Sequence, residues 1–156
     1  MKQLEALKAE GRIEEARQHG LLQIAEHPKH AELHYEVAGL HDLLGREQQA
    51  IPLYQKAIAL GLSEDSLRGA WLGLGSSYRT TGHYTEALAA FEQGLARFPH
   101  AHEFKVFGAM ARYNLGQHKE GMETLLAVLA ETITDPAIVP YRRAIALYAE
   151  DLDRHW

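Results

Sequence analysis

The stretch from Trp71 to Pro99 reads WLGLGSSYRTTGHYTEALAAFEQGLARFP and decides the fold. Its large and small side chains follow one spacing, W-x2-L-G-x2-Y, then A-x3-F, then P, set by Trp71, Leu74, Gly75, Tyr78, Ala87, Phe91 and Pro99. We name the positions of Trp71, Leu74, Gly75 and Tyr78 the four packing slots. A spacing of this kind indicates one copy of a repeated unit, so it predicts further copies on both sides.

Three segments carry the same spacing, namely HYEVAGLHDLLGREQQAIPLYQKAIALGL (34–62), LGLGSSYRTTGHYTEALAAFEQGLARFP (72–99) and PYRRAIALYAEDL (140–152). Through them the chain resembles the tetratricopeptide repeat (TPR) superfamily and, more narrowly, a compact bacterial TPR family of unassigned activity. This resemblance implies an all-α fold, a right-handed α-solenoid of about four helical hairpins plus a closing helix, nine helices in all. We expect a single domain with repeats at about 1–30, 31–67, 68–101 and 102–135 and a closing helix at about 136–152.

The second repeat lies 37 residues before the central one and keeps its register, with Gly45 in the place of Gly82. Its four packing slots hold His34, Val37, Ala38 and His41. The three extra residues fall in GLSEDS (61–66), where Gly61 ends one helix and Ser63 caps the next, so we expect only a longer turn.

The leading repeat has lost part of the pattern. Gly11 and Ala16 keep their places, and Leu4 and Leu7 supply apolar positions in a shortened first helix. Gly20 stands where the next repeats have Tyr54 and Phe91, a loss of aromatic volume that a terminal repeat tolerates because one side faces water. We therefore expect this repeat to be the softest part of the protein.

The fourth repeat leaves its first helix open to two registers. Counting 34 residues from the central repeat puts Lys105 and Arg112 in the slots of Trp71 and Tyr78 and would bury two charges at a cost of several kcal/mol. A shift of one residue instead places Phe104, Phe107, Gly108 and Ala111 in the four packing slots. The shift is preferred, because burial of Phe is favourable.

A last helix is expected after ITDP, with Asp135 as its N-cap and Pro136 in its first turn. Tyr141, Ala144, Ile145 and Tyr148 repeat the spacing of the four packing slots. This segment therefore resembles a lone first helix that covers the open end of the last repeat.

The TPR resemblance implies that the first helix of each hairpin lines a concave groove, one position beyond the packing slots. The groove residues expected on this basis are Tyr35, Gly39, Asp42, Leu72, Ser76, Arg79, Lys105, Ala109, Arg112 and Arg142, or Val106, Met110 and Tyr113 in the unshifted register. Glu32 and Asp42 would make the early end acidic, and Arg79, Arg112 and Arg142 would make the late end basic. Arg79 and Arg142 are candidates for an anion site, because guanidinium forks bind carboxylates.

Composition narrows the function classes. The formal charge of −5, with 16 basic residues dispersed among 21 acidic ones, disfavours nucleic acid. No apolar run approaches the roughly 18 to 20 residues that a membrane span needs, so the expected compartment is the cytoplasm. The chain contains no cysteine, which removes thiolate chemistry and disulfides.

Ten histidines raise the question of a metal site, and His27, His30, His34 and His41 crowd one region. His30 and His34 have the i, i+4 spacing of two ligands on one helix face. We nevertheless expect no metal, because His34 and His41 already occupy packing slots. We expect no cofactor and no catalytic residue either, which predicts a non-enzymatic module that binds another protein or peptide. A small-ligand or signalling-peptide sensor is the alternative, and a homodimer is left open.

Overall fold

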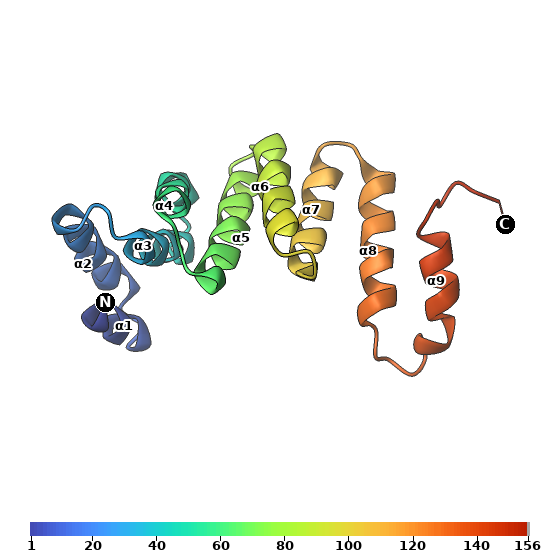
Figure 1. Ribbon diagram of the computed structural model, residues 1–156, viewed down its shortest axis with the longest axis horizontal. Coiled ribbons are helices and arrows are strands. Elements are labelled where there is room, and N and C mark those ends of the chain that lie inside the picture. The colour runs from blue at the N-terminus through green and yellow to red at the C-terminus, as the bar shows by residue number, and fades with distance from the viewer. Residues whose placement is uncertain (156) are drawn as a thin grey trace. The chain divides into compact units, whose positions relative to one another are not determined.

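The computed structural model describes residues 1–155, and this part of the chain is all-α with no strand (Figure 1). The nine α-helices within residues 1–155 confirm the predicted class. They are α1 Lys2–Ala9, α2 Ile13–Glu26, α3 Ala31–Leu43, α4 Glu47–Leu60, α5 Glu64–Thr80, α6 Tyr84–Arg97, α7 His102–Asn114, α8 His118–Thr132 and α9 Arg142–Tyr148, with a short 3₁₀ helix, η1 Val139–Tyr141, before α9.

The chain forms two compact units, Met1–Ala90 and Phe91–Trp156, with the boundary inside α6. In the first unit α1 packs on α2, α2 on α3, α3 on α4 and α4 on α5. In the second unit α7 packs on α8 and α8 on α9. Helices adjacent in sequence are therefore the packing partners, as a chain of helical hairpins requires.

The hairpin turns confirm the repeat spacing. A glycine with positive φ ends each first helix, namely Gly11 at 74°, Gly45 at 67°, Gly82 at 83° and Gly116 at 77°. The residue after each glycine donates its N–H to a carbonyl five residues earlier, as in Arg46 to His41 (2.9 Å) and His83 to Tyr78 (2.8 Å). This is the Schellman arrangement, in which glycine takes the left-handed conformation without steric cost.

The same turn shows that the preferred register of α7 is wrong. Gln117 donates its N–H to the carbonyl of Arg112 at 2.9 Å, so Arg112 occupies the slot that Tyr78 has in the central repeat. Burial agrees, because Gly108 and Ala109 are buried like Leu74 and Gly75. The first helix of the fourth repeat therefore follows the unshifted count.

The charged residues fit these slots because the slots are not closed. The side chains of Lys105 and Arg112 remain 28% and 30% exposed, and Trp71 is also only partly buried. Long aliphatic stems can cover apolar surface while their charged ends reach water. Burial of a phenylalanine was nevertheless the right expectation, since Phe104 is 1% exposed, in the place that Ala70 has in α5.

Glycines make room for large neighbours in both units. A Cβ atom on Gly94 would overlap the ring of Phe104, whereas alanine stands at the equivalent Ala57. A Cβ atom on Gly20 would overlap Val37, so the missing aromatic of the first repeat is not replaced by water. Gly20 is buried, and its space is filled from α1 and α3 by Leu4 and Val37.

The closing helix is shorter than the expected span of 136–152. Asp135 accepts the N–H of Ala137 at 2.8 Å, but it caps a single turn instead of a helix. Pro140 has no N–H to donate to the carbonyl four residues earlier, which disfavours a regular helix through this position. The chain passes through η1, and α9 then spans only Arg142–Tyr148.

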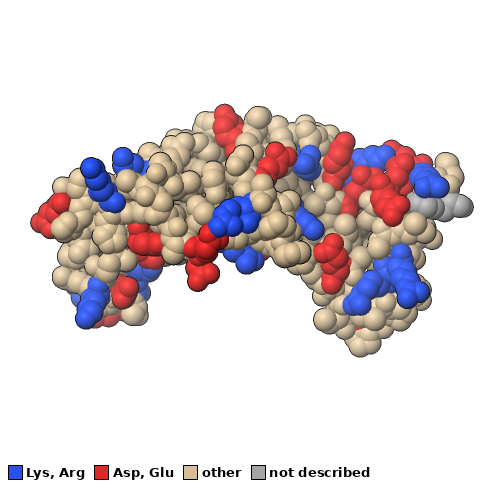
Figure 2. All heavy atoms as spheres, viewed as in Figure 1, with Lys and Arg blue, Asp and Glu red and all other residues tan. Residues whose placement is uncertain are grey.

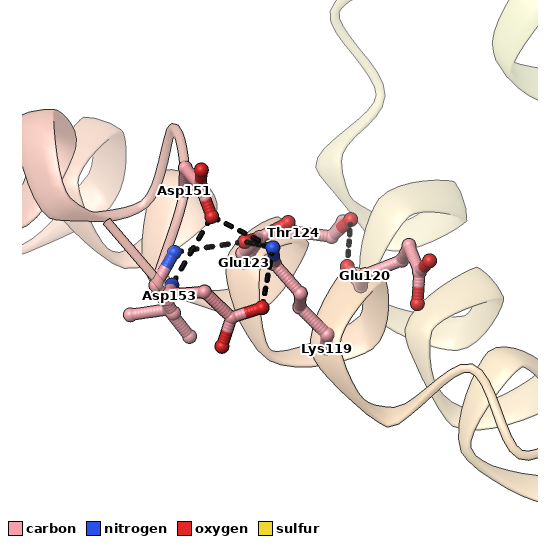
Figure 3. Close-up of polar contacts among 7 residues, drawn as sticks. Lys119, Glu120, Glu123, Thr124, Asp151 and Asp153 are labelled. Atoms are coloured by element: carbon pink, nitrogen blue, oxygen red, sulfur yellow. Dashed lines mark hydrogen bonds and ion pairs between the residues drawn. The ribbon is translucent and has the colours of Figure 1, made fainter.

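The segment after α9 folds back onto the start of α8 (Figure 3). Lys119 Nζ lies 2.7 Å from carboxylate oxygens of both Asp151 and Asp153. The N–H of Leu152 donates to Glu123 Oε1 at 2.9 Å. The acidic residues that follow α9 are thus held at one end of the α8–α9 pair.

Candidate functional site

In the first unit, the face of α3 that was expected to line the groove is bonded into the fold. Asp42 accepts hydrogen bonds from Tyr54 Oη at 2.6 Å and from Ser77 Oγ at 2.9 Å. Burial raises the pKa of the Asp42 carboxyl, and these two hydrogen bonds oppose that shift. Asp42 therefore holds α3, α4 and α5 together.

Two neighbours of Asp42 are also engaged. Tyr35 lies against Gly69 of α5, where a Cβ atom would overlap its hydroxyl, and its ring lies 6.2 Å from that of Tyr54. Glu32 accepts the N–H of Ser63 at 3.0 Å, at the start of α5. Partial burial acts to raise the pKa of Glu32, but hydrogen bonds from Ser66 and Ser63 outweigh it and lower the pKa. Both carboxylates of the expected acidic end thus have internal partners.

On α5, the expected groove residues Leu72, Ser76 and Arg79 are partly buried. They follow the packing residues Trp71, Gly75 and Tyr78 by one position in the sequence. Gly39 of α3 is partly buried as well and lies opposite the hydroxyl of Tyr54. This face offers a small apolar and hydroxyl surface with one guanidinium.

In the second unit, the unshifted register places Val106, Met110 and Tyr113 at the positions of Leu72, Ser76 and Arg79. Met110 is 37% exposed and Tyr113 is 65% exposed, whereas Ala109 is 2% exposed. We name Val106, Met110 and Tyr113 the α7 face. It is apolar, so the expectation that Lys105, Ala109 and Arg112 form this face is wrong.

The two charged residues of α7 have partners inside the second unit. Arg112 donates to Gln117 Oε1 at 2.9 Å and lies 3.4 Å from Glu92 Oε1. Lys105 Nζ lies 3.8 Å from Glu131 Oε1 of α8. The preference for a shifted register assumed that no such partners existed.

A cleft lies between the end of α8 and the start of α9. Its volume is about 410 Å³, and it is lined by Ala127, Ala130, Glu131, Arg142, Arg143 and Ala146. Figure 2 shows basic side chains gathered over the lower part of α9. We name the cleft between these two helices the α8–α9 cleft. Arg142, an expected groove residue, lies here, and Arg143 was missed because the sequence pattern assigned it no face.

The histidines pack as expected. His34 and His41 are 5% and 4% exposed, and His34 Nε2 lies 3.0 Å from the carbonyl oxygen of Pro28. Burial, assisted by Arg17 and Arg46 and opposed by Glu14, lowers the pKa of His41. Within residues 1–155, no group of three His, Cys, Asp or Glu side chains could hold a metal ion.

Two serines, Ser76 and Ser77, follow Gly75 directly. Ser77 is 1% exposed and its hydroxyl donates to Asp42, so it is a buried structural contact.

None of the helices in residues 1–155 is long and apolar enough to cross a bilayer.

Comparison with known proteins agrees with the architecture. A family model described as "Tetratrico peptide repeat" matches residues 31–152. The chain is similar to Superkiller protein 3 of Schizosaccharomyces pombe, with 29% identity over 98 residues, which is 62% of this chain and 7% of that protein. The chain thus spans a small fraction of that relative's length. With three-quarters of its residues covered by the family model, the chain belongs to the tetratricopeptide repeat family.

Proposed function

We propose that this protein is a non-enzymatic interaction module that binds a peptide or helix of a partner protein in the concave groove that its first helices are expected to line. The observation that supports this most strongly is the α7 face, because Met110 and Tyr113 are 37% and 65% exposed on a regular helix. Exposed apolar side chains on a preformed helix face are typical of helix and peptide recognition.

The proposed binding depends on the rigidity of the packed helices. The helices of each unit pack on their sequence neighbours and are fixed at their turns by repeated hydrogen bonds. Such a surface loses little conformational freedom on binding, so more of the contact energy appears as affinity. Met110 adapts its shape to different apolar side chains, and Tyr113 offers a ring and a hydroxyl.

The first unit would contribute a second contact surface made of Leu72, Ser76 and Arg79, with Tyr35 and Gly39 beside it. Its own hydrogen bonds hold Asp42 and Glu32 in place, so we assign them no direct contact with a partner. The net charge of −5 supports a protein partner over nucleic acid, and a cytoplasmic location agrees with the composition.

Selection from a random-peptide phage library on the immobilised full chain tests this function. We expect recovered peptides to bind the wild type and to bind Met110→Asp at least roughly tenfold more weakly, because a carboxylate would enter the apolar contact. Met122→Asp is the matched control, since Met122 of α8 is 52% exposed and lies outside the α7 face. Recovery of no peptide, or equal loss in both variants, would contradict the proposal.

A further inference from the structure

We propose that the α8–α9 cleft binds an acidic side chain of the partner peptide, with Arg143 as the residue that receives the carboxylate. This inference rests on the proposed function and names the chemistry of the bound segment. It is carried by the lining of the cleft, by the lack of a partner for Arg143 among the described residues, and by the position of the acidic residues that follow α9.

The two guanidinium groups differ in what they already bind. Arg142 donates an Nη2 hydrogen to the carbonyl oxygen of Ile133 at 2.7 Å, which fixes its side chain at the mouth of the cleft. Among residues 1–155, nothing forms a hydrogen bond or an ion pair with Arg143. A guanidinium has five N–H donors in a planar fork that matches a carboxylate. Arg143 is therefore the open donor and Arg142 a fixed neighbour.

The one carboxylate in the lining has a lysine beside it. Glu131 Oε1 lies 3.8 Å from Lys105 Nζ, and Glu131 Oε2 lies 3.6 Å from His102 Nε2. Cationic side chains thus outnumber acidic ones around the cleft, so an incoming anion is attracted and not repelled.

The floor of the cleft leaves room for the stem of the bound side chain. Ala127, Ala130 and Ala146 end at Cβ, and the space above them is about 410 Å³. Charge alone would favour any anion, but an apolar floor beneath cations fits the methylene groups and carboxylate of an aspartate or glutamate side chain.

The protein's own acidic segment cannot serve as this ligand in the arrangement observed. Asp151 and Asp153 bind Lys119 at the start of α8 (Figure 3). The cleft is instead formed by the end of α8. The two ends of the α8–α9 pair are therefore distinct: the acidic segment lies at one end, and the basic residues of the cleft lie at the other.

The test uses peptides selected from the same random library, synthesised with a fluorescent label and measured by anisotropy against the full chain. We expect the selected peptides to be enriched in Asp and Glu. Replacement of their acidic residues by Asn or Gln, and Arg143→Glu in the protein, should each weaken binding roughly tenfold or more. Arg143→Lys should recover part of the loss, because lysine keeps the charge but not the fork.

The control reverses the same charge elsewhere. Lys56→Glu alters an exposed lysine of α4 and should leave the affinity for the peptides unchanged. Peptides that bind Arg143→Glu as tightly as the wild type, or whose amide versions bind equally well, would overturn the acidic-ligand inference while the proposed function stands. Loss of binding only when the peptide's C-terminus is amidated would overturn it in favour of a terminal carboxylate. Recovery of no peptide would contradict both proposals.

Discussion

The first helices of the two units use their expected groove positions differently. Beside α5, Asp42 of α3 is an expected groove residue that is bonded into the fold by Tyr54 and Ser77. In α7 the expected groove positions include Met110 and Tyr113, which are 37% and 65% exposed. The repeat pattern thus fixes the backbone, and the side chains at the same sites decide whether a face stabilises the fold or is left for a partner.

The two ends of the second unit differ in how completely the next helix covers an apolar side chain. This difference gives the largest expected effect on stability. Phe91 of α6 is 1% exposed, while Leu125, its equivalent in α8, is 39% exposed beside the short α9. We expect Phe91→Ala to lower the free energy of unfolding by about 4 kcal/mol and Leu125→Ala by about 1 kcal/mol. Urea unfolding monitored by circular dichroism measures both. Similar losses for the two variants would show that α9 covers α8 as completely as α7 covers Phe91.

An intermediate effect is expected at Gly94, where Phe104 takes the space of a side chain. Gly94→Ala should lower the free energy of unfolding by about 2 kcal/mol, because the new methyl group overlaps the Phe104 ring. In a Phe104→Leu background the same substitution should cost less, and the double-mutant cycle measures that coupling. In the first unit the equivalent position is already alanine, Ala57, so a methyl group is accepted there. Equal costs in both backgrounds would exclude this explanation.

The smallest effect is a pH dependence that belongs to the first unit. The pKa of His41 is lowered from 6.5, mainly by burial, so the folded state binds a proton less readily than the unfolded state does. Stability from this group is complete above pH 6.5 and is lost as the pH falls below it toward the folded pKa. His41→Gln should therefore show a shallower loss of stability on acidification.

The measurement is urea unfolding at a series of pH values between neutrality and mild acid. His100→Gln is the matched control, because His100 is exposed in the turn before α7, and it should keep the wild-type slope. A wild-type slope in His41→Gln as well would assign the pH dependence to other groups.

The repeats were predictable because glycine is needed at each turn and because small and large residues alternate at fixed distances. The register of α7 was not, since Lys105 and Arg112 were treated as if the packing slots were closed to water. The partners that accommodate these two residues, Glu131 and Glu92, lie on other helices, and a linear pattern does not pair them.

The candidate site shows the same limit. The groove positions of α3 and α5 follow from the spacing, but their hydrogen bonds to residues on neighbouring helices do not. Arg143 was missed because the start of α9 is set by Pro140 and η1, and the expected helix began six residues earlier. A pair of arginines directly after a proline-delimited turn was the available signal.

The central claim is that the second unit holds the partner through the α7 face and the α8–α9 cleft. Titration of the ¹⁵N-labelled full chain with a selected acidic peptide, followed by amide chemical shifts, tests it most directly. The account predicts the largest shifts at Met110, Tyr113 and Arg143, with little change at Asp42. Shifts confined to α3 and α5 would contradict it.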